Sequence, residues 1–521
     1  MINYNHISSS HSFKTRFFTT FFINIIKVGL GFISGVIIAR SLGPSGYGDY
    51  NFLLGSFSST ISFIDMGASW AFYTFLSQKK RPLKFYLYYL GWLIIQFTGV
   101  LFLVYFVFPD IWREKIWLGH HKKIIILAFI ASFMMAKVWE MVSQAGESIR
   151  ATVIVQLHNI TATLLYLCIV LALLLLHRLA ISNLFLSIAS VYFLLSFILV
   201  NNLRKSLVVK EEIKLVDIFN KFKSYCSPFI LYNVITFIYS FLDIWLLQRF
   251  GGAAQQGFYS IGLRYSAVSL IATMSMVKVF WKEIGEANEI KDYKRIFYLY
   301  TKISRALCFV TAMVSCFLIP FSKEILFFFL GERYVAGWLP LAIMLLYPVY
   351  QSLGQINDAY LLATTHTKLR SVLSIIIMIV SLPITYLLLA PPYQTASGLG
   401  LGALGLALKT IMLAVVSVNV FTHFICKIAN CKFYFIYQFL TIGSLLTISF
   451  IVKASVGLII YALNISITPL ILMLSAAFVY LILVTIIVNI FPQIVGLEKE
   501  IVVKIREQLS AFLKELYVAF F

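Results

Sequence analysis

Long apolar stretches, separated by short charged or Gly/Pro-containing breaks, dominate this sequence. Most reach the length of about 20 residues that an α-helix needs to cross the hydrocarbon core of a bilayer. The pattern predicts an all-α integral membrane protein with about fourteen transmembrane helices. These lie at 17–39, 48–76, 85–108, 124–140, 152–176, 184–202, 226–247, 258–280, 298–320, 338–364, 371–390, 400–424, 435–456 and 466–491.

The breaks between these spans predict the topology. An even number of spans places both termini on one side of the membrane. Most of the 42 Lys and Arg residues lie in the segments on that side. Because cytoplasmic loops carry an excess of Lys and Arg, both termini are expected in the cytoplasm.

Composition agrees with a bilayer protein. Of the 521 residues 60% are hydrophobic and only 12% are charged, with mean hydropathy +0.90. A water-soluble enzyme of this size would need far more polar surface. The net charge of +21 comes largely from residues that flank apolar runs, which favours membrane topology over nucleic-acid binding.

A basic connection near the middle of the chain predicts two linked bundles. We expect an N-terminal bundle of helices 1–6 at 1–203, a cytoplasmic linker at 204–225 and a second bundle of helices 7–12 at 226–424. Helices 13 and 14 would occupy 425–491, followed by a cytoplasmic amphipathic tail at 492–521. The linker shows a weaker amphipathic pattern than the tail.

An internal repeat supports this division. The segments 40–50 and 249–259 align without a gap at an offset of 209 residues. Four identities result: Arg40 with Arg249, Gly43 with Gly252, Gly48 with Gly257 and Tyr50 with Tyr259. Each segment follows the first helix of its bundle, which indicates a parallel repeat with its axis along the membrane normal. The alternative is chance, because short turns favour Gly and helix ends favour Arg.

The sequence holds no motif of hydrolases, transferases or nucleotide-binding proteins, and its six cysteines form no CxxC pair. We therefore expect no enzymatic activity, cofactor or metal site. Ionisable residues inside predicted spans stand out instead, because they are costly to place against lipid. They are Lys27, Asp65, Asp243, Arg264, Asp358 and Lys409.

Lys27 is the hardest of these residues to explain as structural. It lies near the middle of the first span, too far from either end for its side chain to reach the interface. A water-filled interior is the favoured interpretation. There, cations would attract a phosphate, and a carboxylate such as Asp65 could exchange a proton or sodium ion. For Asp243 and Asp358, pairing near a helix end is an equal alternative, with Lys368 or Arg370 as partner of Asp358.

Several motifs carry a resemblance to a known family. These are I-I-A-R-S-L-G-P-S-G-Y-G-D-Y at 37–50, F-I-D-M-G-A-S at 63–69, L-D-I-W-L-L at 242–247 with G-F-Y at 257–259, P-F-S-K-E-I-L-F-F-F-L-G-E-R-Y at 320–334 and G-L-G-L-G-A-L-G at 398–405. Together they resemble polysaccharide flippases of the O-antigen and capsule export type, in the multidrug, oligosaccharidyl-lipid and polysaccharide exporter superfamily.

This resemblance implies two six-helix bundles around a central cavity, plus two C-terminal helices, in a bacterial inner membrane. It implies a flippase that moves an undecaprenyl-diphosphate-linked oligosaccharide repeat unit to the outer leaflet by alternating access. Coupling to H⁺ or Na⁺ and cooperation with a polysaccharide polymerase are further implications. Lys27 best matches the basic cavity residues of the family, followed by Arg264 and Lys409. Asp65, Asp243 and Asp358 are the candidates for ion coupling.

Two other functions stay open. A drug or cation antiporter of the same superfamily would have a cavity dominated by carboxylates. An integral-membrane sugar polymerase or ligase would need catalytic polar residues in a large outer loop. The longest outer loop, between the third and fourth spans, is only about fifteen residues long, which fits a plain connection.

Overall fold

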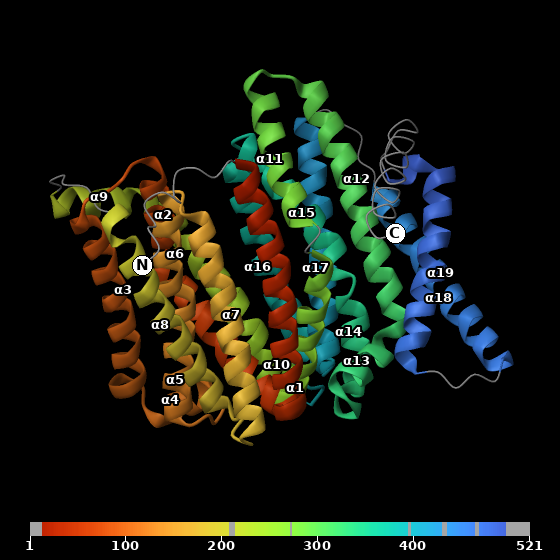
Figure 1. Cartoon of the computed structure of the whole chain (residues 1–521), viewed down its shortest axis with the longest axis horizontal. Coiled ribbons are helices and arrows are strands. Elements are labelled where there is room, and N and C mark those ends of the chain that lie inside the picture. The colour runs from red at the N-terminus through yellow and green to blue at the C-terminus, as the bar shows by residue number, and fades with distance from the viewer. Residues whose placement is uncertain are drawn as a thin grey trace, which may run out of the picture. The chain divides into compact units, whose positions relative to one another are not determined.

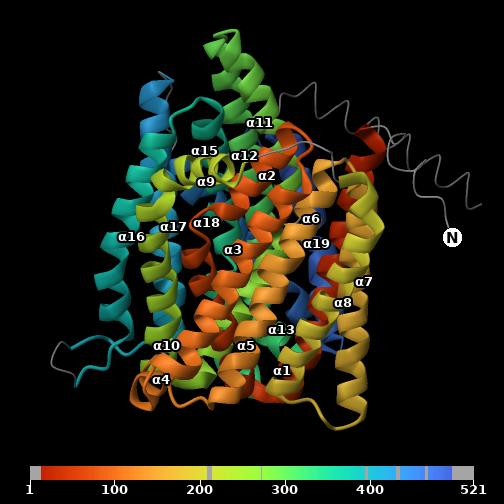
Figure 2. The ribbon, with the colours of Figure 1, turned by 90° about the vertical axis from the view of Figure 1, so that its left-hand side faces the viewer.

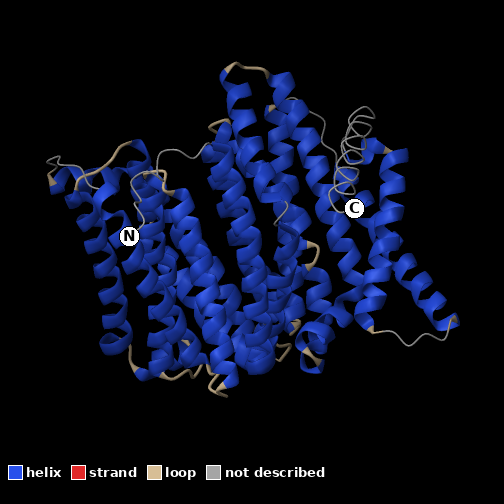
Figure 3. Ribbon diagram, in the orientation of Figure 1, coloured by secondary structure: helices blue, strands red, loops and turns tan. Residues whose placement is uncertain are grey.

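The structure is a computed structural model that describes residues 13–207, 214–270, 273–393, 397–429, 435–463 and 468–495. Within these ranges every long regular element is a helix (Figure 3). This confirms the predicted all-α membrane fold. The expected amphipathic tail lies outside the described residues from residue 496 onward.

The helices are labelled in Figure 1. Their bounds are α1 Phe13–Asp65, α2 Ala68–Gln78, α3 Leu83–Phe102, α4 Asp110–Ile116, α5 Lys122–Phe133, α6 Trp139–Ser148, α7 Thr152–Leu175, α8 Ile181–Leu207, α9 Leu215–Cys226, α10 Ile230–Ser266, α11 Thr273–Glu289, α12 Tyr293–Leu318, α13 Ser322–Leu330, α14 Trp338–Met344, α15 Tyr347–Ala363, α16 Thr367–Leu389, α17 Gly402–Ile428, α18 Phe435–Ala462 and α19 Pro469–Ile490.

Among the described residues, twelve helical stretches are long and apolar enough to cross a membrane. Two of them, Phe22–Asp65 and Leu215–Leu270, are 44 and 56 residues long. Each contains a break in helical geometry, at Gly43 and at Gly252. The chain is therefore a multi-pass membrane protein, while the count of fourteen spans stays a prediction.

Contacts group the chain into two compact units. The first unit comprises Met1–Ser260 and Met378–Leu406, and the second comprises Ile261–Ile377 and Ala407–Phe521. Helices α10, α16 and α17 each contribute residues to both units. The grouping thus follows contact density rather than the ends of helices, and the domain bounds expected from the sequence stay a prediction.

Each unit has its own packed interior. In the first unit, α1 packs against α5 and α7, while α8 packs against α5, α6 and α7. Figure 1 shows α3, α5, α7 and α8 running along similar directions. In the second unit, α12 packs against α11, α15 and α18, and α18 packs against α19. A cluster of buried apolar residues in this unit includes Phe280, Ile356 and Phe421.

The two repeat segments share an unusual backbone geometry. Gly43 has φ 69° and ψ 176°, and its match Gly252 has φ 80° and ψ 175°. L-amino acids with side chains rarely adopt this conformation, so glycine is required at both breaks. The identity of the two conformations supports a true repeat over chance matching of glycines.

The repeat segments also touch each other within the first unit. A Cβ atom at Gly48 would lie 1.7 Å from the carbonyl oxygen of Ala253, and one at Gly257 would lie 2.2 Å from that of Pro44. Ala253 follows Pro44 by the same 209-residue offset, so the contact is reciprocal. Such a contact is the internal equivalent of a two-fold interface.

Part of the expected cytoplasmic linker forms the short amphipathic helix α9. Its apolar residues Ile218 and Phe222 are buried against α2 and α3. The Phe222 ring lies 5.5 Å from that of Phe75 and 5.7 Å from that of Phe85. Figure 2 shows α9 running across the direction of the long helices. An amphipathic helix in this position is typical of a membrane interface.

Candidate functional site

A buried polar cluster in the first unit joins Asp65 to Lys137. The Lys137 Nζ atom lies 3.0 Å from the Asp65 Oδ1 atom, and both side chains are only 8% exposed. Charged residues are almost never buried to this extent unless they are paired. The sequence predicted Asp65 as an ion-coupling residue, and the structure now shows the cation beside it.

A break between α1 and α2 positions the carboxylate. Helix α1 ends at Asp65, and the next two residues, Met66 and Gly67, have φ values of 51° and 86°. The left-handed conformation of Met66 is strained for a residue with a side chain. After the break, the backbone N–H of Ser69 donates to Asp65 Oδ2 at 3.2 Å. Asp65 therefore accepts a bond from the first turn of α2, where the helix dipole favours a negative charge.

The broken end of α1 is also satisfied from a neighbouring helix. The Gln96 amide on α3 donates to the carbonyl oxygen of Ile64 at 2.9 Å. Backbone groups exposed by a break inside a membrane need such partners, because lipid offers none. The break is thus a built feature of this unit.

Lys137 reaches the cluster from a π-helical segment, Met134–Val138, between α5 and α6. Besides Asp65, its Nζ atom donates to Ser69 Oγ at 2.8 Å and lies 3.8 Å from Glu140 Oε2. Insertions of π-helix into α-helices are frequent at functional sites. The extra residue of this turn changes which face of the helix the lysine presents.

Hydroxyl groups extend the cluster. Ser69 Oγ donates to Asp65 Oδ1 at 2.9 Å and lies 3.1 Å from the Tyr89 hydroxyl oxygen. A serine hydroxyl has one proton, which here goes to Asp65, so the Tyr89 hydroxyl donates to Ser69. Donors and acceptors therefore run from Tyr89 through Ser69 to Asp65.

The cluster has an imbalance of charge when all its groups are ionised. It holds one ammonium group, Lys137, and two carboxylates, Asp65 and the 39% exposed Glu140. The excess carboxylate is Glu140, which is partly exposed and therefore accessible to a proton or another cation. The arrangement can therefore take up and release a positive charge while the inner pair stays intact.

The sequence did not single out Lys137, although the predicted fourth span, 124–140, contains it. Three residues before the end of that span, this lysine fits a cation at the cytoplasmic end of a helix. The membrane-spanning stretch of the structure runs on from Lys122 to Ser148, which places Lys137 well inside it. The missed signal was a lysine and a glutamate three residues apart within an otherwise apolar run. Nothing in the sequence around Ser69 or Tyr89 indicates that these residues belong to the cluster.

The three predicted cation sites lie on three helices. Lys27 on α1 is exposed, and its side chain makes no ion pair or hydrogen bond within the described ranges. Arg264 near the end of α10 is also exposed, whereas Lys409 on α17 is 0% exposed. Lys27 belongs to the first unit and the other two to the second. A shared role of the three in binding an anion stays a prediction.

The other two predicted carboxylates have partners. Arg370 donates to Asp358 from Nε at 2.6 Å and from Nη2 at 3.2 Å, the two-pronged geometry of a strong ion pair. Pairing with Arg370 was one of the alternatives expected from the sequence. Asp243 accepts from the Thr385 hydroxyl at 2.9 Å. A role of either carboxylate in ion coupling stays a prediction.

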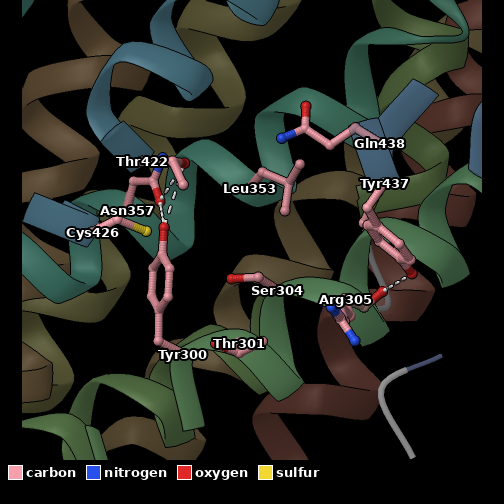
Figure 4. Close-up of a pocket in the computed structure, with 11 residues that line it drawn as sticks. Tyr300, Thr301, Ser304, Arg305, Leu353, Asn357, Thr422, Cys426, Tyr437 and Gln438 are labelled. Atoms are coloured by element: carbon pink, nitrogen blue, oxygen red, sulfur yellow. Dashed lines mark hydrogen bonds between the residues drawn. The ribbon is translucent and has the colours of Figure 1, made fainter. Parts of the chain in front are cut away.

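The second unit contains a small polar pocket of about 60 Å³ between α12, α15, α17 and α18. Figure 4 shows the Tyr300 hydroxyl meeting Asn357, at 2.6 Å, next to Thr422. Asn357 in turn donates to Thr422 at 3.1 Å. The volume suits about two water molecules and is far too small for a sugar. We interpret this pocket as a small gap between helices that polar contacts hold together.

A second ionic contact lies beside the repeat segments. His120, in the loop between α4 and α5, has its Nε2 atom 3.3 Å from Asp49 Oδ1, and Gln248 donates to the same oxygen at 2.7 Å. Burial lowers the pKa of His120, but the hydrogen bonds to Asp49 and to the Trp117 carbonyl and the Asp49 charge together raise that pKa above its ordinary value.

Within the described part of the chain, no group of three or more His, Cys, Asp or Glu residues could hold a metal ion. The cluster around Asp65 is therefore not such a group.

This chain is similar to a known protein family and to several solved structures. A family model described as polysaccharide biosynthesis protein matches residues 14–281, just over half of the chain. A search of curated proteins found no match. Among solved structures, the lipid II flippase MurJ in an inward closed conformation has a TM-score of 0.68 at 17% identity, covering 91% of this chain and 98% of that chain.

A second similar structure is the outward-facing conformation of a multidrug resistance MATE family transporter of the MOP superfamily. Its TM-score is 0.51 at 12% identity, with 83% of this chain and 95% of that chain covered. At such identities the likeness establishes the fold. This chain therefore has the helical fold found in both the lipid II flippase and the multidrug transporter.

Proposed function

Since this chain belongs to the polysaccharide biosynthesis protein family, we propose that it is a flippase. Its cargo is an undecaprenyl-diphosphate-linked oligosaccharide, moved from the cytoplasmic to the outer leaflet of a bacterial inner membrane by alternating access. The family match carries this proposal. A fold shared with a lipid II flippase over 91% of the chain supports it, because that protein's name describes a lipid-linked cargo.

The diphosphate of the cargo needs a cation on the transport path. Lys27 is the principal candidate, because its ammonium group is exposed and is not engaged by any described acidic residue. Arg264 and Lys409 are further candidates. Because Lys409 is fully buried, it can contact cargo only in a second conformational state. Binding shifts two states only if their affinities for the cargo differ.

The cluster around Asp65 is the proposed coupling site, and a proton is the proposed ion. The Lys137 ammonium already occupies the position beside Asp65 that a sodium ion would need. A proton on Glu140 would remove the excess negative charge with no other rearrangement. Release of that proton would restore the excess negative charge. The relative stability of the two conformational states of the transport cycle then depends on pH. Asp243 and Asp358 are secondary candidates.

The decisive experiment is depletion of the protein in its native host, followed by extraction of lipid-linked sugars. The proposal expects single repeat units to accumulate on the cytoplasmic leaflet. Units that still reach the outer leaflet unpolymerised would instead indicate a polymerase. Export of small cationic dyes from vesicles, with no effect on lipid-linked sugars, would indicate a drug antiporter.

Lys27→Ala tests the cargo site in the same cells. We expect normal membrane insertion with reduced export of the polysaccharide. Unchanged export at an equal protein level would remove Lys27 from the mechanism and leave the flippase proposal itself standing.

A further inference from the structure

A groove of about 940 Å³ runs along α3 of the first unit and reaches the start of α9. Its α3 lining consists of Lys84, Leu87, Tyr88, Gly91, Trp92 and Ile95. Their spacing of three and four residues places them on one stripe of the helix. This stripe is separate from the cluster around Asp65.

Gly91 creates the depression in this stripe. A Cβ atom built at Gly91 would have no heavy atom within 4 Å apart from its immediate chain surroundings. Among the residues that the structure describes, no neighbouring helix fills the space that a side chain would occupy. On either side of it, Tyr88 and Trp92 provide aromatic walls.

Two lysines from different elements border the groove. Lys84 lies in the first turn of α3, and Lys214 directly precedes α9. Both are exposed, and neither forms an ion pair with a described residue. The sequence around Lys214, residues 204–223, is itself net basic, with six Lys or Arg against three Asp or Glu. The groove thus combines a positively charged end with an apolar floor.

The remaining surface of α3 shows that the groove opens toward lipid. Leu83, Leu87, Leu90, Ile94 and Ile95 are all exposed large apolar residues on a membrane-spanning helix. The amphipathic helix α9 covers one end of α3, which places the lysines at the level of lipid headgroups. Tyr and Trp side chains are enriched at that same level.

We propose that this groove binds one anionic phospholipid. Lys84 and Lys214 hold its headgroup phosphate through charge-assisted hydrogen bonds, and its acyl chain lies over Gly91 toward Ile95. The bound lipid fills the space between α3 and α9. A zwitterionic lipid carries the same phosphate with an attached cation, so its attraction to two lysines is weaker.

Native mass spectrometry of the full-length protein in mixed micelles tests this site. The probes are phosphatidylglycerol and phosphatidylcholine of identical acyl chains, supplied at equal concentration. We expect one tightly retained phosphatidylglycerol per chain. Because each lysine near a headgroup contributes roughly a fivefold change in affinity, K84Q with K214Q should weaken retention about 25-fold. K80Q, a nearby exposed lysine outside the groove, is the charge control.

Filling the groove gives a second, independent readout. Gly91→Leu should abolish retention of the lipid. Gly99→Leu is the matched control, because Gly99 lies on the same helix with equally open space around it and does not line the groove. Leucine also forms helices better than glycine, so both variants should fold, and their melting temperatures verify this.

Three results would overturn the proposal. The wild-type protein would show no preference for phosphatidylglycerol, or Gly91→Leu would retain as much lipid as Gly99→Leu. Alternatively, millimolar inorganic phosphate would displace the lipid, which would assign the lysines to a soluble phosphate. None of these outcomes depends on transport, so the site stands or falls separately from the flippase function.

Discussion

Lys137 and Asp65 form an ion pair of 3.0 Å that links two separate breaks in helical geometry. Asp65 ends α1 next to the strained Met66, and Lys137 lies in a π-helical segment. Each irregularity would be unfavourable alone, and each presents one half of the pair. The pair therefore connects the broken end of α1 to the π-helical segment between α5 and α6.

Removing one member of this pair should destabilise the protein strongly. Lys137→Met leaves a buried carboxylate without its cation, for which we expect a loss of about 3–5 kcal/mol in the free energy of unfolding. Asp65→Asn combined with Lys137→Met removes both charges and should recover most of that loss. Denaturant unfolding in mild detergent measures both.

The control for this comparison is Arg295→Met. Arg295 pairs with Glu283 at 2.5 Å, but the two side chains are 40% and 37% exposed. An exposed pair contributes at most about 1 kcal/mol. If the double variant Asp65→Asn with Lys137→Met is as unstable as Lys137→Met alone, the unpaired Asp65 carboxylate is not the cause of the lost stability.

Glu140 is predicted to carry the coupled proton. Glu140→Gln removes the excess carboxylate and leaves the pair of Asp65 and Lys137 in place. We expect transport driven by a pH gradient to fall at least tenfold, while transport down the cargo's own gradient persists. Glu147→Gln on the same helix is the matched control. Equal gradient-driven rates for Glu140→Gln and wild type would exclude Glu140 as the proton carrier.

The close backbone contact between the repeat segments leaves no room for a side chain at Gly48 or at Gly257. An added methyl group would overlap backbone atoms at 1.7 Å and 2.2 Å, and backbone cannot yield as a flexible side chain can. We expect Gly48→Ala and Gly257→Ala each to lower stability by at least about 1–3 kcal/mol.

Gly29→Ala, on the same helix as Gly48, provides the comparison. It has open space around its Cβ position and should be neutral or slightly stabilising. Thermal melts in detergent measure all three variants. Similar melting temperatures for Gly29→Ala and Gly48→Ala would contradict the close approach of the repeat segments.

His120 predicts a pH dependence of stability. Its folded-state pKa is raised above the unfolded value by Asp49 and the Trp117 carbonyl, despite the opposing effect of burial. The contribution of His120 to the free energy of unfolding is therefore fully present below the ordinary histidine pKa. It is lost as the pH rises through the folded-state pKa. His120→Asn should flatten the melting temperature between about pH 6 and pH 8. His121→Asn, its exposed neighbour, should retain the wild-type profile.

Much of the fold was predictable because the bilayer imposes a simple length rule. Apolar runs marked most membrane-spanning helices, and the matched Gly43 and Gly252 marked two backbone breaks of the same geometry. Glycine at a position with positive φ is a local requirement, and local requirements can be read from sequence.

The site was only half predictable. Asp65 was found because a carboxylate within an apolar run is costly. Lys137 was missed because its burial depends on where a helix ends and on a π-helical segment, neither of which hydropathy reveals. Ser69 and Tyr89 belong to the cluster only through packing of α2 and α3. Partners far apart in sequence need the fold to bring them together.

The central claim, movement of a lipid-linked anionic sugar, is tested most directly by reconstitution. Purified protein is placed in vesicles whose two leaflets carry a fluorescent undecaprenyl-diphosphate oligosaccharide, and a membrane-impermeant quencher reports the exposed fraction. With the wild-type protein, we predict that the inner-leaflet pool becomes quenchable, at a rate that rises with an imposed pH gradient and falls in Lys27→Ala. A protected pool that stays protected at every pH, as in protein-free vesicles, would contradict the flippase account.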